Sequence, residues 1–218
     1  MSATTVACVL RSGGIYDARW VRALYRGVRE HWPVDALDFV CLTDVPVGHP
    51  GVREVPLVTG WPGWWAKMEL LAPGTFDGPV LYLDLDTLPV GPLADLAAHA
   101  LDFAMLSDLW QPHLAQSGVM AWMPGETSRA AWDVFTEDPR ERMHEFHGDG
   151  EFIRSVVDPV TRLQDVFPGR IAGFKIRSPR GIIPGPPEGS SLCCGHGEPR
   201  FSDPAAGWAH ALWRERAV

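Results

Sequence analysis

The sequence contains few cysteines, and none of them forms a C-x-x-C pair. The four are Cys8, Cys41, Cys193 and Cys194. The vicinal pair at 193 and 194 does not have the spacing of a disulfide framework. We therefore expect all four to be small buried side chains in a protein of a reducing compartment.

Long apolar runs are missing as well. Arg11 interrupts the first apolar segment after a few residues, and no later run approaches the roughly 20 residues that a membrane span needs. We expect no signal peptide and no transmembrane segment. The sequence thus predicts a soluble cytoplasmic protein.

Basic residues are in the minority. Lys and Arg total 19 against 27 Asp and Glu, which gives a net charge of −8. The chain therefore lacks the basic footprint of a general nucleic-acid binder, and we expect no nucleic-acid partner. Any phosphate group that it binds must be met by a few placed cations, a metal ion or backbone N–H groups.

The pattern of apolar residues predicts one α/β domain of 218 residues. Expected strands cover 6–10, 37–42, 52–55, 80–83, 103–106 and 119–122. Expected helices are one capped by Asp17 and ended at 31–33, and others near 64–71, 93–99, 127–136 and 149–157. A Pro- and Gly-rich loop is expected at 179–189. We predict a mixed, mostly parallel sheet flanked by helices, with a nucleotide-binding half at about 1–100 and an acceptor half at about 101–218.

Two aspartates follow the apolar run at 80–83. Asp84 and Asp86 are two residues apart, so both carboxylates lie on one face if the strand continues. They come at the carboxyl end of a buried strand, where open α/β sheets place their ligands. A divalent ion that joins them to a diphosphate would offset the cost of two neighbouring carboxylates and stabilise a departing nucleotide diphosphate. Chance alone predicts roughly one such pair in the chain, so the placement matters more than the motif.

The chain resembles the GT-A-fold glycosyltransferases, in particular the glycogenin and galactosyltransferase group called family eight. The motifs that carry the resemblance are, in chain order, WAKMEL (65–70), LYLDLDTLP (81–89), QSGV (116–119), HGDG (147–150) and CGHGEPRF (194–201). Gln116 stands where the family has Asn, and Gly150 where it has Gln. The last motif is a shortened form of the family's closing His-x-x-Gly-x-x-Lys-Pro, as in bacterial and phage members.

The resemblance implies a set of residues for the metal and the diphosphate. His196 would be the third metal ligand beside Asp84 and Asp86, and Arg200 would contact the diphosphate. An imidazole added to two carboxylates suits Mn²⁺, with Mg²⁺ as the alternative. Gly197 would let the backbone approach the phosphates, and Lys67 would contact the phosphate or the carboxylate pair.

The remaining donor and acceptor contacts are also implied by the resemblance. Arg11, Ser12 and Tyr16 would surround the nucleoside, with Tyr16 stacking on the base or packing at the helix entry, and Leu85 would belong to the same donor site. Gln116 would position the sugar or the acceptor. Asp149 would do the same, would cap the helix that follows, or both.

The predicted function is transfer of a sugar from a nucleotide-diphosphate sugar, expected to be a UDP-sugar, to an acceptor hydroxyl. The resemblance favours retention at the anomeric carbon. The acceptor, whether saccharide, lipid-linked or protein, is not specified by the residues.

Two alternatives are open from the residues alone. A haloacid-dehalogenase-type phosphatase would use Asp84 as its nucleophile, because its motif also reads Asp-x-Asp after an apolar strand. Its usual glycine is missing, however, and about 80 residues precede the motif here. A non-catalytic carbohydrate-binding protein would use the tryptophans.

We expect the cluster of Trp61, Trp64 and Trp65 to be mainly core, and the C-terminal stretch around Trp213 to dock on the domain.

Overall fold

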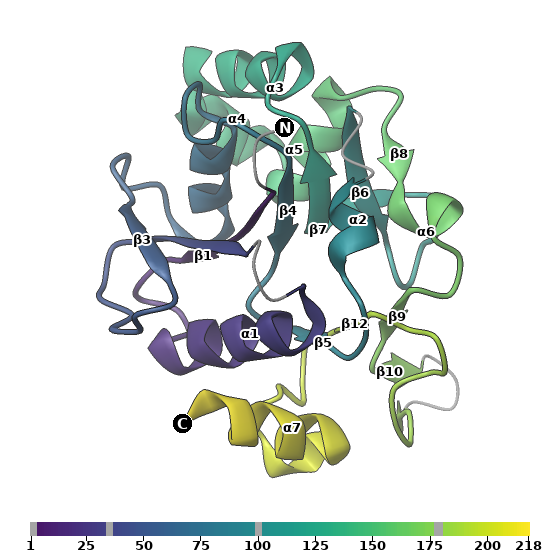
Figure 1. The fold of residues 1–218 in the computed structure, drawn as a ribbon. Coiled ribbons are helices and arrows are strands. Elements are labelled where there is room, and N and C mark those ends of the chain that lie inside the picture. Colours follow the sequence, from purple (N-terminus) through teal and green to yellow (C-terminus); the bar gives the residue numbers. More distant parts are fainter. Residues whose placement is uncertain (1–3, 34–36, 99–101, 177–180) are drawn as a thin grey trace.

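The computed structural model describes residues 4–33, 37–98, 102–176 and 181–218. Its centre is a seven-stranded sheet in the order β3-β2-β1-β4-β7-β6-β8 (Figure 1). The strands of this sheet are β1 (Thr5–Leu10), β2 (Asp38–Thr43), β3 (Arg53–Pro56), β4 (Val80–Leu83), β6 (Phe103–Ser107), β7 (Ala115–Trp122) and β8 (Thr161–Arg162). The first four run parallel, whereas β7 is antiparallel to both of its neighbours. The predicted mixed, mostly parallel sheet is confirmed.

Helices cover both faces of this sheet. They are α1 (Ala18–His31), η1 (Gly63–Leu71), α2 (Ala94–Ala98), α3 (Glu126–Glu137), α4 (Pro139–Glu145), α5 (Asp149–Val156), α6 (Leu163–Val166), η2 (Pro204–Ala206) and α7 (Trp208–Ala217). Asp17 caps α1 as predicted, because its side chain accepts a hydrogen bond from the Arg19 amide. The predicted helix at 64–71 is a 3₁₀ helix rather than an α-helix. Residue 99, the expected end of another helix, lies outside the described residues.

A second, smaller sheet consists of strands that the sequence did not indicate. β5 (Thr87–Pro89) pairs antiparallel with β12 (Leu192–Cys194), which pairs parallel with β9 (Ile171–Gly173). β10 (Lys175–Ile176) and β11 (Gly181–Ile182) form a separate two-stranded pair. The prediction of a loop over 179–189 is therefore wrong at β11, and 179–180 lie outside the described residues. Strands of two or three residues are too short for a periodic pattern to reveal them.

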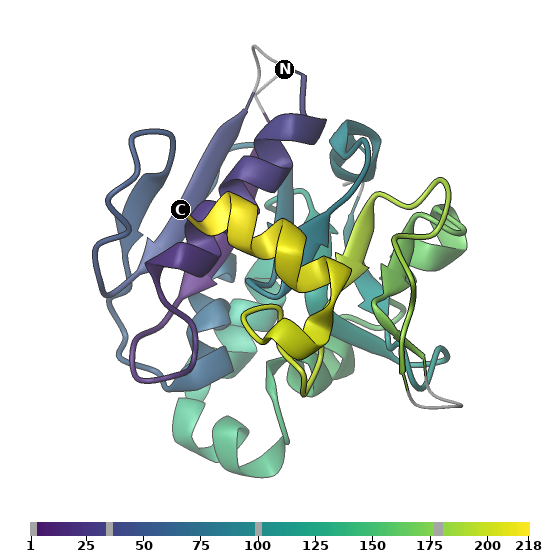
Figure 2. The same ribbon diagram turned by 90° about the horizontal axis from the view of Figure 1, so that it is seen from below.

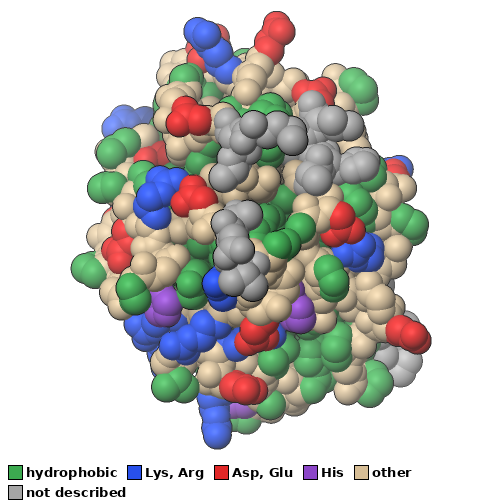
Figure 3. Space-filling model, in the orientation of Figure 1, with side chains coloured by type: hydrophobic (Ala, Val, Ile, Leu, Met, Phe, Trp, Pro, Cys, Tyr) green, Lys and Arg blue, Asp and Glu red, His purple; other side chains and the backbone are tan. Residues whose placement is uncertain are grey.

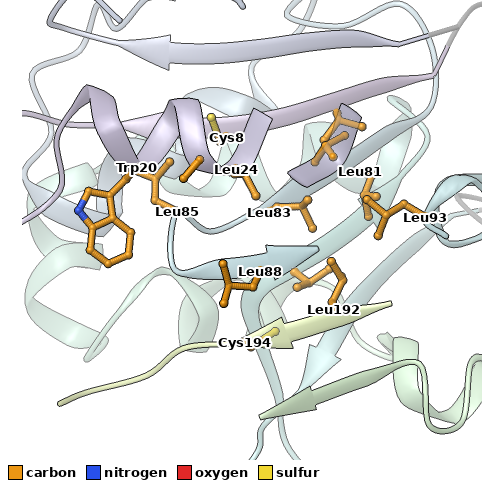
Figure 4. Packing of buried hydrophobic residues seen from close by; sticks show 14 of the residues in the cluster. Cys8, Trp20, Leu24, Leu81, Leu83, Leu85, Leu88, Leu93, Leu192 and Cys194 are labelled. Atoms are coloured by element: carbon orange, nitrogen blue, oxygen red, sulfur yellow. The ribbon is translucent and has the colours of Figure 1, made fainter. Parts of the chain in front are cut away.

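The core has two layers, one on each face of the main sheet. Along β1, Val6, Cys8 and Leu10 belong to the layer under α1 and α7, whereas Ala7 and Val9 face the layer that contains η1, α3 and α5. Figure 4 shows the first layer between α1 and the small sheet, where Leu88 and Leu192 pack near Leu83 and Leu85. All four cysteines are free and buried, as expected.

The C-terminal helix α7 lies across α1 (Figure 2). Trp213 of α7 packs against Trp20 of α1 with ring centroids 5.0 Å apart, so the predicted docking of this stretch is confirmed. On the face seen in Figure 3, basic side chains gather at the lower left, near α1, which carries four arginines. In the described part of the chain, no helix has the length and apolarity to cross a membrane.

Three parallel strands end at the same edge of the main sheet. β1, β2 and β4 are paired in parallel, so the loop after Leu10, the residues after Thr43 and the aspartates after Leu83 all emerge there. This edge carries the acidic motif predicted from the sequence.

Candidate functional site

The two aspartates lie in a turn. β4 ends at Leu83, and the amide of Thr87 donates to the carbonyl of Asp84 at 3.1 Å, which closes the turn before β5. The condition that the strand continues through Asp86 is therefore not met. Both carboxylates nevertheless border the same two cavities, because the turn leads directly into β5 and its pairing with β12.

The larger cavity has a volume of about 690 Å³, and the smaller one about 180 Å³. Residues of the larger cavity that were expected in the site are Arg11, Ser12, Tyr16, Lys67, Asp84, Leu85, Asp86 and Arg200. Those of the smaller cavity are Asp84, Asp86, Gln116 and His196. Asp84 and Asp86 border both cavities and so form a wall between them. Ten of the twelve predicted site residues border one of the cavities, and an eleventh, Asp149, contacts Lys67. The exception is Gly197.

Asp84 is held by one hydroxyl and one ammonium group. The Tyr82 hydroxyl donates to its Oδ1 at 2.5 Å, and Lys67 Nζ lies 3.3 Å from the same oxygen. Loss of hydration and the nearby Asp86 charge raise the pKa of Asp84 to about 6, although Lys67 acts in the opposite direction. Tyr82 was not predicted as a site residue; it lies in β4, two positions before Asp84, and its hydroxyl reaches the Asp84 carboxylate.

Lys67 is a buried cation with three partners. Its side chain is 8% exposed, its Nζ lies 3.0 Å from Asp149 Oδ2, and it donates to Ser117 Oγ at 3.0 Å. Burial alone would lower the pKa of Lys67, but Asp149 and Asp84 raise it above its usual value. Lys67 therefore stays charged and joins η1, the turn after β4, β7 and α5 at the base of the site.

Asp149 does not cap the helix that it begins. The N-cap of α5 is Gly148, and Asp149 is the first helical residue. Its buried carboxylate pairs with Lys67 instead. The capping alternative is wrong because the ion pair draws the side chain toward the interior, where an unpaired lysine would be costly.

Asp86 has its own pair of partners on the other side of the turn. The Tyr16 hydroxyl donates to Asp86 Oδ2 at 2.8 Å, and Arg200 Nη1 lies 3.0 Å from the same oxygen. Burial raises the pKa of Asp86, although the Tyr16 hydrogen bond and Arg200 oppose this. The ring of Tyr16 meets Trp20 edge to face at 4.9 Å, which is the helix-entry packing expected as one alternative.

Arg11 and Ser12 are organised by a residue that was not predicted in the site. Arg11 Nη1 lies 2.8 Å from Asp44, and Ser12 donates to Asp44 through both its amide and its hydroxyl. Asp44 follows β2, just as Arg11 follows β1, and the two strands are adjacent and parallel. This cluster fixes the loop at the far end of the larger cavity.

His196 reaches the site from the distant segment after β12. Its two ring nitrogens are buried and have no hydrogen-bond partner in the part of the chain that the structure describes. The ring of Trp110 packs edge to face against the imidazole at 4.7 Å. Burial and the Lys175 charge lower the pKa of His196, so the ring is neutral at pH 7, as a metal ligand must be. Gln116 Oε1, on the same small cavity, accepts from the Gly118 amide at 2.7 Å.

The fit of these residues to a metal ion is partial. Asp84, Asp86 and His196 border one cavity and offer the oxygen and nitrogen donors that Mn²⁺ or Mg²⁺ would take. Within the described ranges, however, no three His, Cys, Asp or Glu side chains lie close enough together to hold a metal ion. The carboxylates are compensated by Lys67, Arg200 and two tyrosine hydroxyls instead.

The tryptophan cluster divides between core and cavity. Trp65 is buried and stacks on Phe135, whereas Trp64 is 57% exposed and borders the larger cavity. The expectation of core packing is thus confirmed for Trp65 and wrong for Trp64. Trp64, the second residue of η1, is exposed, whereas its neighbour Trp65 is buried.

No family model matches the sequence, and no curated protein matches it either. Solved structures do resemble the fold. GlyE, a glycosyltransferase of Streptococcus pneumoniae TIGR4, superposes with a TM-score of 0.68 at 16% identity over 98% of this chain, which spans 60% of the GlyE chain. The galactosyltransferase LgtC, solved in complex with donor and acceptor sugar analogs, gives 0.66 at 13% identity over 98% of this chain and 95% of its own. The bifunctional glycosyltransferase WbbM gives 0.68 at 14% identity over all of this chain and 50% of its own.

Proposed function

The chain has the GT-A fold of these glycosyltransferases, and we propose that it transfers a sugar from a nucleotide-diphosphate sugar, a UDP-sugar in our proposal, to an acceptor hydroxyl. Asp84, Asp86 and His196 border one cavity, and they would hold a divalent cation, Mn²⁺ or Mg²⁺, once they move closer together than they lie in this structure. The observation that carries the proposal is the wall of two carboxylates between two cavities at the carboxyl ends of β1 and β4. When bound, the cation would offset charge on the diphosphate and so favour its departure.

The larger cavity suits the nucleotide part of the donor. Its volume of about 690 Å³ lies in the range of small-molecule sites. Arg11, Ser12 and Tyr16 would bind the nucleoside at one end, with Leu85 on the cavity wall. Arg200 would exchange its pairing with Asp86 for the diphosphate, since a guanidinium can bind phosphate oxygens through two parallel hydrogen bonds.

The other end of the site would bind the sugar. Lys67 would hold Asp149 in place, and Asp149 would accept hydrogen bonds from hydroxyl groups of the sugar or the acceptor. Gln116 would contribute from the smaller cavity, and Gly197 would let the backbone approach the phosphates. Retention of the anomeric configuration and membership of family eight are parts of the same proposal.

The alternatives have less support. A phosphatase with Asp84 as nucleophile is not favoured by the fold, which is shared with glycosyltransferases. A carbohydrate-binding module without catalysis has no need of the buried network of Lys67, Asp149 and Asp84.

Ligand-dependent stability tests the proposal directly. UDP with Mn²⁺ should raise the melting temperature of the wild type, because a ligand at 100 times its Kd adds about 2.7 kcal/mol to stability. The shift should vanish in Asp84→Ala and persist in the control Asp133→Ala, which changes an exposed residue of α3. UDP-sugar hydrolysis should follow the same pattern. Equal shifts in Asp84→Ala and the wild type, or none in the wild type, would count against the proposed site.

A further inference from the structure

The chain contains very few lysines. Only two of its 19 basic residues are lysines, Lys67 and Lys175, and the other 17 are arginines. Lys67 contacts Asp84 in the acidic turn, and Lys175 contacts the segment that carries His196 and Arg200. Lys67 belongs to the predicted motifs, but Lys175 does not. Only the contacts of Lys175 indicate its role.

Lys175 Nζ donates hydrogen bonds to two backbone carbonyl groups. One belongs to His196, and the other, 2.8 Å away, belongs to Glu198. Gly197 lies between them with φ +57°, a conformation that other residues rarely adopt. This left-handed residue turns the chain so that both carbonyls meet one ammonium group. An ammonium group has three N–H donors, so it can serve both carbonyls at once.

The charge of Lys175 is not taken up by a carboxylate among the described residues. The nearby acids, Asp86 and Glu198, both form their ion pairs with Arg200. The Lys175 ammonium group also lies over the buried ring of Phe174, 4.9 Å from the ring centroid. Burial and the Arg200 charge lower the pKa of Lys175, which agrees with a cation placed against carbonyls rather than acids.

We propose that Lys175 is a positioning residue of the nucleotide-sugar site: by binding the carbonyls of His196 and Glu198 it fixes the segment that presents the His196 imidazole and the Arg200 guanidinium to Asp86. This inference rests on the proposed function. Arg200 reaches Asp86 at 3.0 Å, and His196 borders the cavity shared with Asp86, so a shift of their backbone would move both groups together. Lys175 itself need not contact the donor.

The test compares Lys175→Met with Lys175→Arg. Methionine keeps most of the unbranched stem but removes the charge and the donors, whereas arginine keeps a charge and N–H donors. Isothermal titration should give a UDP Kd, with Mn²⁺ present, that rises about tenfold or more in Lys175→Met. Lys175→Arg should return it to within about threefold of the wild type. Arg129→Met, which removes an exposed cation of α3, is the matched control and should bind UDP normally.

Lysine labelling gives a second readout, which is measured on the wild-type protein. Protein labelled with ¹³C in lysine alone has two ¹³Cε signals, and Lys175→Arg assigns them. The Lys175 signal should shift when UDP and Mn²⁺ bind, because the segment that it holds responds to the ligand. If the wild type binds UDP but Lys175→Met binds it equally well, or the Lys175 signal does not move, the positioning role is refuted while the proposed function stands. If the wild type itself does not bind UDP, the proposed function fails and this inference fails with it.

Discussion

Asp84→Asn should stabilise the ligand-free protein at neutral pH although it removes a proposed metal ligand. The pKa of Asp84 is raised from 3.8 to about 6, so the folded state favours the protonated carboxyl, which asparagine resembles in shape and charge. A difference of about two pKa units corresponds to about 3 kcal/mol. Because the side chain is 32% exposed, solvent screening reduces this value, and we expect a gain of about 1–2 kcal/mol.

The pH dependence has a definite sign. Between pH 3.8 and about 6 the folded wild type holds a proton that the unfolded chain releases, so its free energy of unfolding decreases as the pH rises through this window. Asp84→Asn has no carboxyl group at this position, so this decrease in its free energy of unfolding is absent. Its advantage over the wild type should therefore be largest at pH 7.5 and shrink toward pH 4.

Urea unfolding in the presence of EDTA, at pH 4.5 and 7.5, measures this difference. Asp38→Asn is the control with the opposite sign, because Arg53 lowers the pKa of Asp38 and the substitution should cost stability at pH 7.5. The reasoning is refuted if Asp84→Asn is less stable than the wild type at pH 7.5, or if its advantage does not change with pH. A gain in stability together with lost UDP binding would mark Asp84 as a residue retained for function.

Four further substitutions test the packing around the site by urea unfolding. Trp65→Ala should cost about 3–5 kcal/mol because a buried ring is lost, whereas Trp64→Ala should cost under about 1 kcal/mol; equal costs would contradict the assignment of Trp64 to the cavity. Arg216→Met should cost about 1–3 kcal/mol, because the Pro89 carbonyl loses its donor at 2.8 Å, and an unchanged midpoint would argue against that contact. Gly195→Ala places a Cβ 2.9 Å from the Asp86 carbonyl oxygen, so it should cost about 1–3 kcal/mol of stability. It should also weaken UDP binding in titrations. Normal binding would mean that the turn at Asp86 moves aside without loss of the site.

Local patterns determined the larger elements and the position of the acidic motif. Each long strand of the main sheet has several apolar residues in a row, and α1 has a capping Asp17 followed by apolar residues at helical spacing. These signals are contained within a few neighbouring residues. The order of the motifs also predicted which residues border the cavities, since Asp84, Lys67 and Arg200 all lie there.

Only the tertiary structure decided how these groups are paired. β5, β9 and β12 have three residues each, too few to show a period, yet their pairing brings the segment with His196 and Arg200 back to Asp86 across more than 100 residues of sequence. The contacts of Asp149 with Lys67, and of Lys175 with two carbonyls, likewise join residues that no spacing rule relates. A sequence pattern records which face of an element is apolar, whereas partners between distant elements are fixed only when the sheets assemble and every buried charge must find a neighbour.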